Sequence, residues 1–290
     1  MRWQGRQGSS NVDDRRGGGG SRSRRTAGGF GIGTIIIIIL AMVFGFDPSA
    51  FLGLTGGGGS PAPVETTAGD QPTDNLGQFV SVTLKETEDV WNKLFREEYG
   101  ASYREPVLVL FDGQVNSACG FGSAATGPFY CPADQQVYID LSFYETLRSR
   151  FKAPGDFAMA YVVAHEVGHH VQNLLGYSDQ VQRARARMSK KDANAMLVRL
   201  ELQADYLAGV WAHYADRTAG ILEEGDLEEA LNAANAIGDD NIQKKTQGYV
   251  VPDSFTHGTS AQRKRYLLAG YKTGDASKKS LDYFFQAREL

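Results

Sequence analysis

Cysteine and histidine are scarce in this chain of 290 residues, which has two cysteines and five histidines. With no second Cys/His pair near Cys119 and Cys131, we do not expect a metal site built from cysteine thiolates. Internal repeats are absent, which argues against a repeat architecture. The scarcity makes the clustering of three histidines at His165, His169 and His170 the most informative feature of the sequence.

Basic residues are depleted from most of the chain. Residues 1–25 carry a net charge of +5, from seven arginines against two aspartates, so the other 265 residues carry −9 of the total of −4. A nucleic-acid-binding domain would present a basic stripe on its folded part. We therefore expect no nucleic-acid partner.

Long apolar runs are also absent, with one exception at residues 30–46. This run reads FGIGTIIIIILAMVFGF and carries no charge. It is short but long enough to span a bilayer, and arginines on its N-terminal flank would place the N-terminus in the cytoplasm. A buried core helix or a cleaved signal peptide are the alternatives, but no small-x-small cleavage site follows the run. The sequence thus predicts a single-pass anchor in the cytoplasmic membrane with the rest of the chain in the periplasm or cell exterior.

Composition divides the chain into four parts. Residues 1–29 are rich in Arg, Gly and Ser, which predicts a disordered, basic cytoplasmic segment. Residues 30–46 form the anchor, and the Gly/Pro-rich residues 47–75 a linker. Residues 76–290 form the folded domain.

The domain alternates between helical and strand-like hydrophobic patterns, with many more helices than strands. We expect a helix-rich α+β domain with a small sheet. The expected strands are 106–111 and 136–141, and the expected helices are 76–99, 142–152, 157–175, 179–188, 189–218, 226–237, 260–271 and 277–288.

The two cysteines lie in one glycine-rich stretch, CGFGSAATGPFYC, which runs from Cys119 to Cys131. An even count, close spacing and an oxidising compartment favour a disulfide that closes this loop. Two free thiols are the alternative.

The segment YVVAHEVGHH places His165 and His169 one helical turn apart on the same face, where both imidazoles can bind one zinc ion. Glu166 is rotated by about 100 degrees, where a carboxylate can take a proton from water at the metal without binding the metal. Apolar neighbours indicate a buried helix, and core histidines satisfied by packing are the alternative. His170 points off this face and is expected to pack.

A second helical segment, ELQADYLAG, supplies two acids at the same spacing, Glu201 and Asp205. Neighbouring Leu and Ala favour burial, and two buried acids need a cation or a histidine partner. We expect Glu201 to be the third zinc ligand and Asp205 to accept the remaining N–H of a ligand histidine. An exposed charged face paired with Arg199 is the alternative.

HExxH followed by a helical ExxAD resembles the Glu-zincin metallopeptidases, including the HtpX-like membrane enzymes. The chain from about residue 74 is more similar to the neutral zinc metallopeptidase family of the YpfJ type. The motifs that carry this resemblance are SACG (117–120), GPFYCP (127–132), YIDL (138–141), AHEVGHHVQ (164–172), ELQADYLAG (201–209), IGDD (237–240) and SFTHGTSAQR (254–263). It implies a zincin-like metallopeptidase domain that uses Zn²⁺.

The resemblance to HtpX-like enzymes implies two further site residues. His257 would donate to the oxyanion, and Arg263 would brace the site electrostatically. A surface histidine is the alternative for His257. In zincins an edge strand before the active helix pairs with the substrate, so Val137–Leu141 is the expected docking strand. Asp239 and Asp240 are further candidates for residues that support the site from behind the ligands.

These expectations combine into a membrane-anchored zinc endopeptidase that cleaves peptide or protein substrates with Glu166 as general base. The alternatives are a zinc-binding envelope module without peptidase activity and another zinc hydrolase, such as a deacylase. An intact Glu166 argues against the first alternative, because a purely binding site needs no general base.

Overall fold

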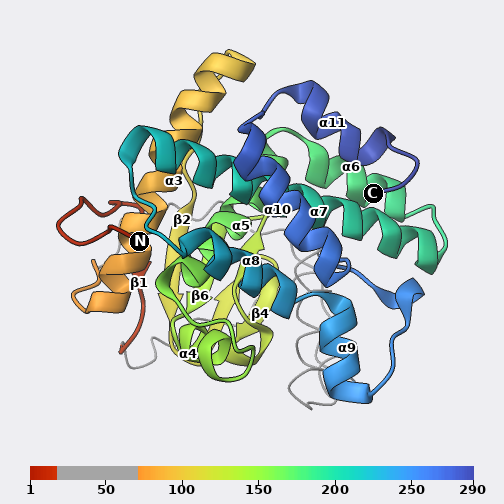
Figure 1. Ribbon diagram of the computed structural model, residues 1–290, viewed down its shortest axis with the longest axis horizontal. Coiled ribbons are helices and arrows are strands. Elements are labelled where there is room, and N and C mark those ends of the chain that lie inside the picture. The colour runs from red at the N-terminus through yellow and green to blue at the C-terminus, as the bar shows by residue number, and fades with distance from the viewer. Residues whose placement is uncertain (18–70) are drawn as a thin grey trace.

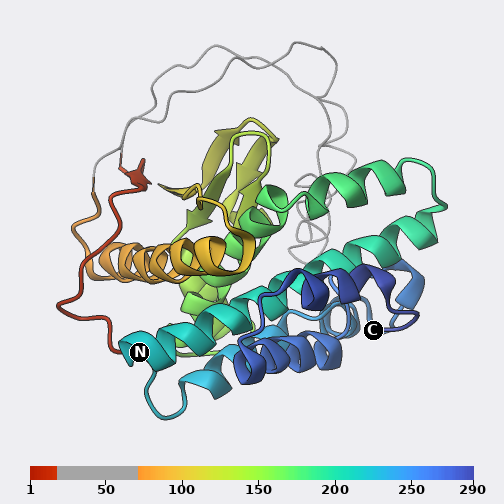
Figure 2. The ribbon, with the colours of Figure 1, turned by 90° about the horizontal axis from the view of Figure 1, so that it is seen from above.

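The computed structural model describes residues 1–17 and 71–290, and these form the expected helix-rich α+β domain. Figure 1 shows the elements, and Figure 2 shows the C-terminal helices, drawn in teal and blue, gathered on one side of the molecule. The helices are α3 (Asn75–Tyr99), α4 (Ser142–Ser149), α5 (Asp156–Leu174), α6 (Tyr177–Arg185), α7 (Lys190–Tyr214), α8 (Asp226–Ala236), α9 (Asp239–Gln247), α10 (Ser260–Thr273) and α11 (Lys278–Gln286).

The main sheet has four strands in the order β1 (Val12–Asp14), β2 (Val107–Phe111), β6 (Gln136–Asp140) and β5 (Phe129–Cys131). β1, β2 and β6 run parallel, and β5 is antiparallel to β6. β6 lies between β2 and β5, and β5 pairs with it over Gln136–Tyr138. The expectation that Val137–Leu141 is an edge strand for substrate is therefore wrong for Val137 and Tyr138, and β5 is the outer strand on that side.

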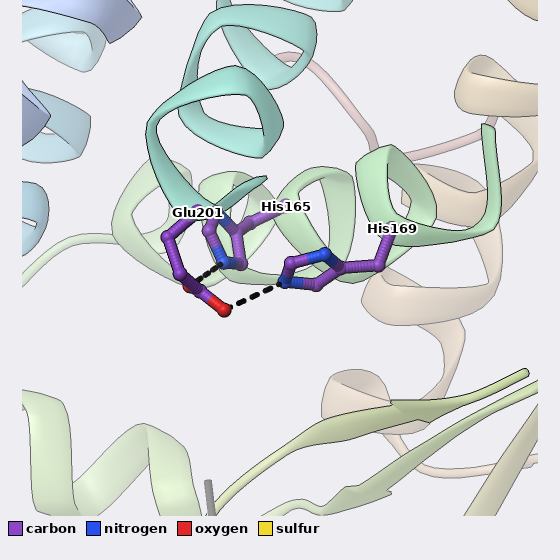
Figure 3. A group of neighbouring side chains, drawn as sticks. All are labelled: His165, His169 and Glu201. Carbon is purple, nitrogen blue, oxygen red and sulfur yellow. Dashed lines mark hydrogen bonds and ion pairs between the residues drawn. The ribbon is translucent and has the colours of Figure 1, made fainter. Parts of the chain in front are cut away.

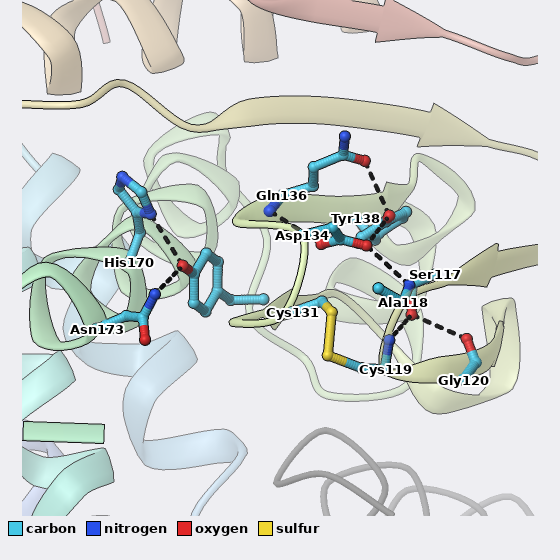
Figure 4. The surroundings of a disulfide bond; sticks show 11 residues. Ser117, Ala118, Cys119, Gly120, Cys131, Asp134, Gln136, Tyr138, His170 and Asn173 are labelled. Atoms are coloured by element: carbon cyan, nitrogen blue, oxygen red, sulfur yellow. Dashed lines mark hydrogen bonds between the residues drawn. A yellow bond between two sulfur atoms is a disulfide. The ribbon is translucent and has the colours of Figure 1, made fainter. Parts of the chain in front are cut away.

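A separate hairpin, β3 (Gln114–Ser117) and β4 (Gly120–Ser123), is tied to the outer strand by a disulfide. Cys119 lies in the turn of the hairpin and Cys131 ends β5, with their Cα atoms 5.7 Å apart. Figure 4 shows the bond and its surroundings. The predicted pairing of the two cysteines is confirmed.

Residues 1–17 belong to the folded domain, which corrects the expectation of disorder for this part of 1–29. Val12 is fully buried where β1 joins the sheet. Two arginines of this segment pair with acids of the fold: Arg6 Nε lies 2.7 Å from Glu86 Oε1, and Arg16 contacts Asp14 at 2.7 Å.

The predicted single-pass membrane topology is corrected. Among the described residues no helix is both long and apolar enough to cross a bilayer. The apolar run at 30–46, like most of the linker at 47–75, lies outside the described residues. The anchored, extracytoplasmic arrangement is not retained.

Helix α5 is the central helix of the domain and contacts α3, α7, α8 and the sheet. It begins after Gly155, whose φ of 117° is in the region that favours glycine. The carboxylate of Glu229 accepts a hydrogen bond from the Phe157 amide at 3.1 Å and so caps the start of the helix. Sixteen of its residues are buried, as the apolar flanks of the histidine motif predicted.

Glycines set the close approach of the helices around α7. At Gly168 of α5 a Cβ would lie 3.0 Å from the carbonyl oxygen of Ala204, so any larger residue would push α7 away. At Gly270 of α10 a Cβ would meet the Tyr206 carbonyl oxygen at 2.0 Å. These contacts bring the acids of α7 against α5 on one side and α10 on the other.

Candidate metal centre

Two imidazoles of α5 face one carboxylate of α7 (Figure 3). Glu201 Oε2 lies 3.2 Å from His165 Nε2, and Glu201 Oε1 lies 3.4 Å from His169 Nε2. All three residues are buried, at 7%, 8% and 4% exposure for His165, His169 and Glu201. The structure thus brings together the three side chains that the sequence predicted as ligands.

The donor set fits a tetrahedral zinc ion. One atom from each of the three side chains lies within 4.8 Å of the other two. Two ligands bound at about 2.1 Å to one tetrahedral zinc lie about 3.4 Å apart, close to the separations seen here. His169 Nε2 makes no hydrogen bond despite its burial, because the 3.4 Å contact with Glu201 lacks hydrogen-bond geometry. A buried nitrogen without a donor or acceptor is the expected state of an atom reserved for a metal.

Electrostatics at the centre also favour a cation. Burial alone would lower the pKa of His165, but the carboxylates of Asp205 and Glu201 outweigh it and raise this pKa to about 9. Burial alone would raise the pKa of Glu201, but the nearby histidines lower it well below its usual 4.5. The carboxylates therefore favour positive charge at His165, and a metal ion satisfies the same potential.

Glu166 lies beside the ligands and is free of hydrogen bonds at one oxygen. Its side chain lines the same cavity as His165, His169 and Glu201 and is 7% exposed. Oε2 has no partner, and burial raises the pKa of this carboxyl above its usual value. A carboxylate with a raised pKa is a better acceptor for a proton from water.

Asp205 contacts Nδ1 of the His165 ring, on the side away from Glu201. Asp205 is itself ion-paired. Its Oδ1 lies 2.9 Å from His165 Nδ1 and accepts a hydrogen bond from the Tyr161 hydroxyl at 2.6 Å. Arg263 donates to both carboxylate oxygens, at 2.8 and 2.9 Å. Burial would raise the pKa of Asp205, but Arg263 and His165 lower it to about 2. Arg263 is therefore committed to Asp205 in this structure.

His257 reaches the same cavity from the loop before α10. Its Nδ1 lies 3.1 Å from Asp239 Oδ1. The other oxygen of Asp239 accepts three backbone amides, those of Thr256, His257 and Gly258, at 2.7 to 3.0 Å. Asp239 thus fixes both the loop and the ring of His257, whose side chain is 13% exposed and lines the cavity.

The rest of the cavity wall is apolar. Beyond the polar residues already described, it is lined by Pro128, Phe143, Phe151, Val162, Ile237 and Ile242. These side chains come from α4, α5, α9 and the connections between elements. The three candidate ligands therefore line a cavity whose remaining wall is predominantly apolar.

The remaining histidine of the motif packs away from the metal, as expected. His170 is fully buried, with its Nδ1 3.0 Å from the Tyr130 hydroxyl, and Figure 4 shows this contact. Its Nε2 lies 2.5 Å from the Arg104 carbonyl oxygen. Burial lowers the pKa of His170 to about 4, so the ring is neutral and bridges α5 to the chain before β2.

Two residues at the centre were missed from the sequence. Tyr161 contacts Asp205 and lies one turn before His165. Gln172 contacts His169 and lies three residues after that histidine. Both positions share a helical face with a ligand histidine. Helical spacing could have found them, but Tyr and Gln are common in buried helices and carry no metal-site signature.

Comparison with known proteins identifies relatives along nearly the whole chain. A family model described as "Putative neutral zinc metallopeptidase" matches residues 1–282. The Escherichia coli K12 protein YpfJ is 47% identical over 281 residues, which cover 96% of this chain and 97% of its own. The Mycobacterium tuberculosis H37Rv protein Rv2575 is 39% identical over 258 residues, covering 81% of this chain and 82% of its own. No solved structure matches the chain.

Proposed function

The chain belongs to the neutral zinc metallopeptidase family, whose cofactor is Zn²⁺, and we propose that it hydrolyses peptide bonds with Glu166 as general base. The observation that carries this proposal is the buried Glu166 carboxylate beside the cluster of His165, His169 and Glu201, with no hydrogen-bond partner at Oε2. A binding site alone needs the three ligands but has no use for a fourth group that is buried, ionisable and unpaired at one oxygen.

In this proposal His165, His169 and Glu201 hold the metal. A zinc ion held by these three side chains would supply the Lewis acidity that activates a water for attack. Asp205 fixes the ring of His165 by accepting from Nδ1, so that Nε2 faces the metal. Arg263 and Tyr161 act through Asp205, whose charge they balance.

Glu166 takes the proton of the attacking water and returns it to the leaving amine. Its raised pKa, caused by burial, narrows the gap to neutral pH and improves it as an acid in the second step. His257 donates a hydrogen bond to the carbonyl oxygen as negative charge develops there. Asp239 keeps the His257 ring in place for this by holding Nδ1.

The apolar wall of the cavity bears on which peptides fit. Phe143, Val162 and Ile242 line it next to the ligands. A substrate residue beside the scissile bond would lie against these side chains, so we expect a preference for large apolar residues there. Peptide libraries should show it, and Ile242→Asn should reduce kcat/KM for apolar peptides by about 10–200-fold while sparing peptides with a small polar residue at that position.

Two other functions share the same centre. A zinc-binding module without peptidase activity would use the ligands and leave Glu166 idle, and another hydrolase, such as a deacylase, would use all four groups on a different substrate. The family description favours peptides over both.

The test compares the full-length protein with its Glu166→Gln variant. A fragment that starts near residue 74 is unsuitable, because it would lack β1. Both proteins should bind one equivalent of zinc, while the variant should cleave casein or library peptides about 10²–10⁴-fold more slowly. Equal rates in the two proteins, or no cleavage by the zinc-loaded wild type, would contradict peptide hydrolysis through Glu166.

A histidine variant tests the oxyanion role. His257→Ala should lower kcat by about 10²–10³-fold and leave zinc binding intact. The matched control is His213→Ala, because His213 is also buried but contacts the Tyr271 carbonyl oxygen away from the cavity. If His213→Ala lowers kcat as much, the effect of His257 is a general loss of folding.

A further inference from the structure

Gln172 contacts the metal ligand His169 at the end of a chain of buried amides. Gln172 Oε1 lies 2.8 Å from His169 Nδ1. Gln172 Nε2 donates to the Leu200 carbonyl oxygen at 2.6 Å and to Gln203 Oε1 at 3.0 Å. Gln203 Nε2 donates in turn to the Leu281 carbonyl oxygen at 2.9 Å. The chain links α5, α7 and α11, and both glutamines are fully buried.

The two carbonyl oxygens fix the direction of every hydrogen bond in this chain. A carbonyl oxygen only accepts, so the amide nitrogens of both glutamines must face Leu200 and Leu281. With either amide turned over, two oxygens would meet without a proton in a dry interior, and each unmade bond would be costly. The oxygen of Gln172 therefore faces His169, and His169 Nδ1 must be the donor.

The tautomer of His169 follows from this direction. With the proton on Nδ1, the lone pair is on Nε2, the atom that faces Glu201 and makes no hydrogen bond. A neutral imidazole in this tautomer is the form that binds a metal through Nε2.

Gln172 also holds the second ligand helix. Leu200, whose carbonyl oxygen it binds, directly precedes Glu201 in α7. One side chain thus orients a histidine ligand of α5 and fixes the backbone beside the carboxylate ligand of α7. Asp205 likewise orients a histidine ligand, His165, but it does not bind the backbone beside Glu201.

We propose that Gln172 is a positioning residue of the metal centre, which sets the His169 tautomer through the amide chain of Gln172 and Gln203 that is anchored on α11. This inference rests on the proposed ligand set but not on peptidase activity. A protein that binds zinc and cleaves nothing would overturn the proposed function and leave the role of Gln172 intact.

Two substitutions separate the roles of Gln172. Gln172→Met keeps the size of the side chain and removes every hydrogen bond, so zinc affinity should fall by about 10–100-fold. Gln172→Glu still accepts from His169 Nδ1 but cannot donate to Leu200. It should lose thermal stability while keeping zinc affinity closer to the wild type than Gln172→Met does.

The measurements are zinc affinity of the full-length protein by competition with a chromogenic chelator, melting temperature with and without zinc, and the visible spectrum of the Co²⁺ form. Gln136→Met is the matched control, because Gln136 is 3% exposed and bonds the Tyr138 hydroxyl away from the metal. It should lower the melting temperature and leave zinc affinity and the Co²⁺ spectrum unchanged.

The outcomes decide the proposal. It is overturned if Gln172→Met binds zinc like the wild type, or if Met and Glu lose affinity only in proportion to their loss of stability. If Gln172→Met does not fold, Gln172→Glu decides alone: zinc affinity within about tenfold of the wild type supports the role, and a greater loss overturns it.

Discussion

The two histidine ligands are supported in opposite ways. His165 Nδ1 lies 2.9 Å from an ionised carboxylate, Asp205, which is itself ion-paired with Arg263. His169 Nδ1 lies 2.8 Å from a neutral amide, Gln172. Both supports are fully buried, and both leave Nε2 facing Glu201.

The difference shows that ring orientation does not require charge. A buried carboxylate raises the basicity of its histidine but needs a counter-ion, and it becomes a liability when that partner is lost. A buried amide chain needs no counter-ion and depends only on complete hydrogen bonding. The ion-paired side should therefore be the more sensitive of the two to substitution, and four single variants and one double variant measure that contrast.

Glu201→Ala removes the residue that both histidines share and should have the largest effect. We expect no stoichiometric zinc by metal analysis, because two imidazoles alone do not hold the ion against a chelator. Glu86→Ala is the control, since Glu86 is 7% exposed and paired with Arg6 far from the centre. If Glu201→Ala retains one equivalent of zinc, the ligand assignment is wrong. The comparison between the supports of His165 and His169 then no longer applies.

Asp205→Asn breaks the ion-paired side. It leaves the Arg263 guanidinium buried without a carboxylate, which should cost about 3–5 kcal/mol of unfolding free energy. Zinc should bind about 10–100-fold more weakly. Urea unfolding of the metal-free protein measures the first and chelator competition the second.

A double variant tests whether the loss of stability in Asp205→Asn comes from the unpaired, buried charge of Arg263. Asp205→Asn with Arg263→Met should be more stable than Asp205→Asn alone, because neither charge remains. A double variant that is less stable than the single one would show that packing, not charge, dominates this side.

Gln203→Met weakens the neutral side at its far end. It leaves the Leu281 carbonyl oxygen unpaired, which should cost about 1–3 kcal/mol. Gln172 keeps its bond to Leu200, so zinc affinity should change by less than the 10–100-fold expected for Asp205→Asn. A loss as large as that of Asp205→Asn, in the same urea and chelator assays, would erase the proposed contrast.

Tyr161→Phe should have the smallest effect, although it lies on the ion-paired side. Asp205 loses one neutral donor but keeps Arg263 and His165, so the cost should be about 1 kcal/mol. Tyr130→Phe is the matched control, because its hydroxyl contacts His170 and Asn173 away from the metal. Only Tyr161→Phe should shift zinc affinity. If both variants shift it equally, the effect is not transmitted through Asp205.

The ionic half of the centre could be predicted from the sequence, and the neutral half could not. His165, His169, Glu201 and Asp205 are residue types that need a partner when buried, and their one-turn spacing places them on common helical faces. Gln172 shares a face with His169 in the same way. A side-chain amide can satisfy its hydrogen bonds with any pair of backbone groups. The spacing of a glutamine from a histidine therefore does not by itself indicate a metal site.

The strands were harder to predict than the helices. Helix boundaries expected for 76–99 and 157–175 differ by one residue at most from Asn75–Tyr99 and Asp156–Leu174. Helix periodicity is a local property, whereas strand order depends on partners distant in the chain. The interior position of β6 and the pairing of Val12–Asp14 with β2 are both of this kind.

The sequence by itself determined the chemistry of the candidate metal centre: two imidazoles one turn apart, a carboxylate beside them and two acids on a second helix. It also determined the cysteine pair. Only the tertiary structure decided that residues 1–17 belong to the domain, that β5 and not β6 is the outer strand, and that amides hold His169. Helical spacing is encoded within a few residues, whereas strand pairing and buried hydrogen bonds are chosen among distant segments by packing.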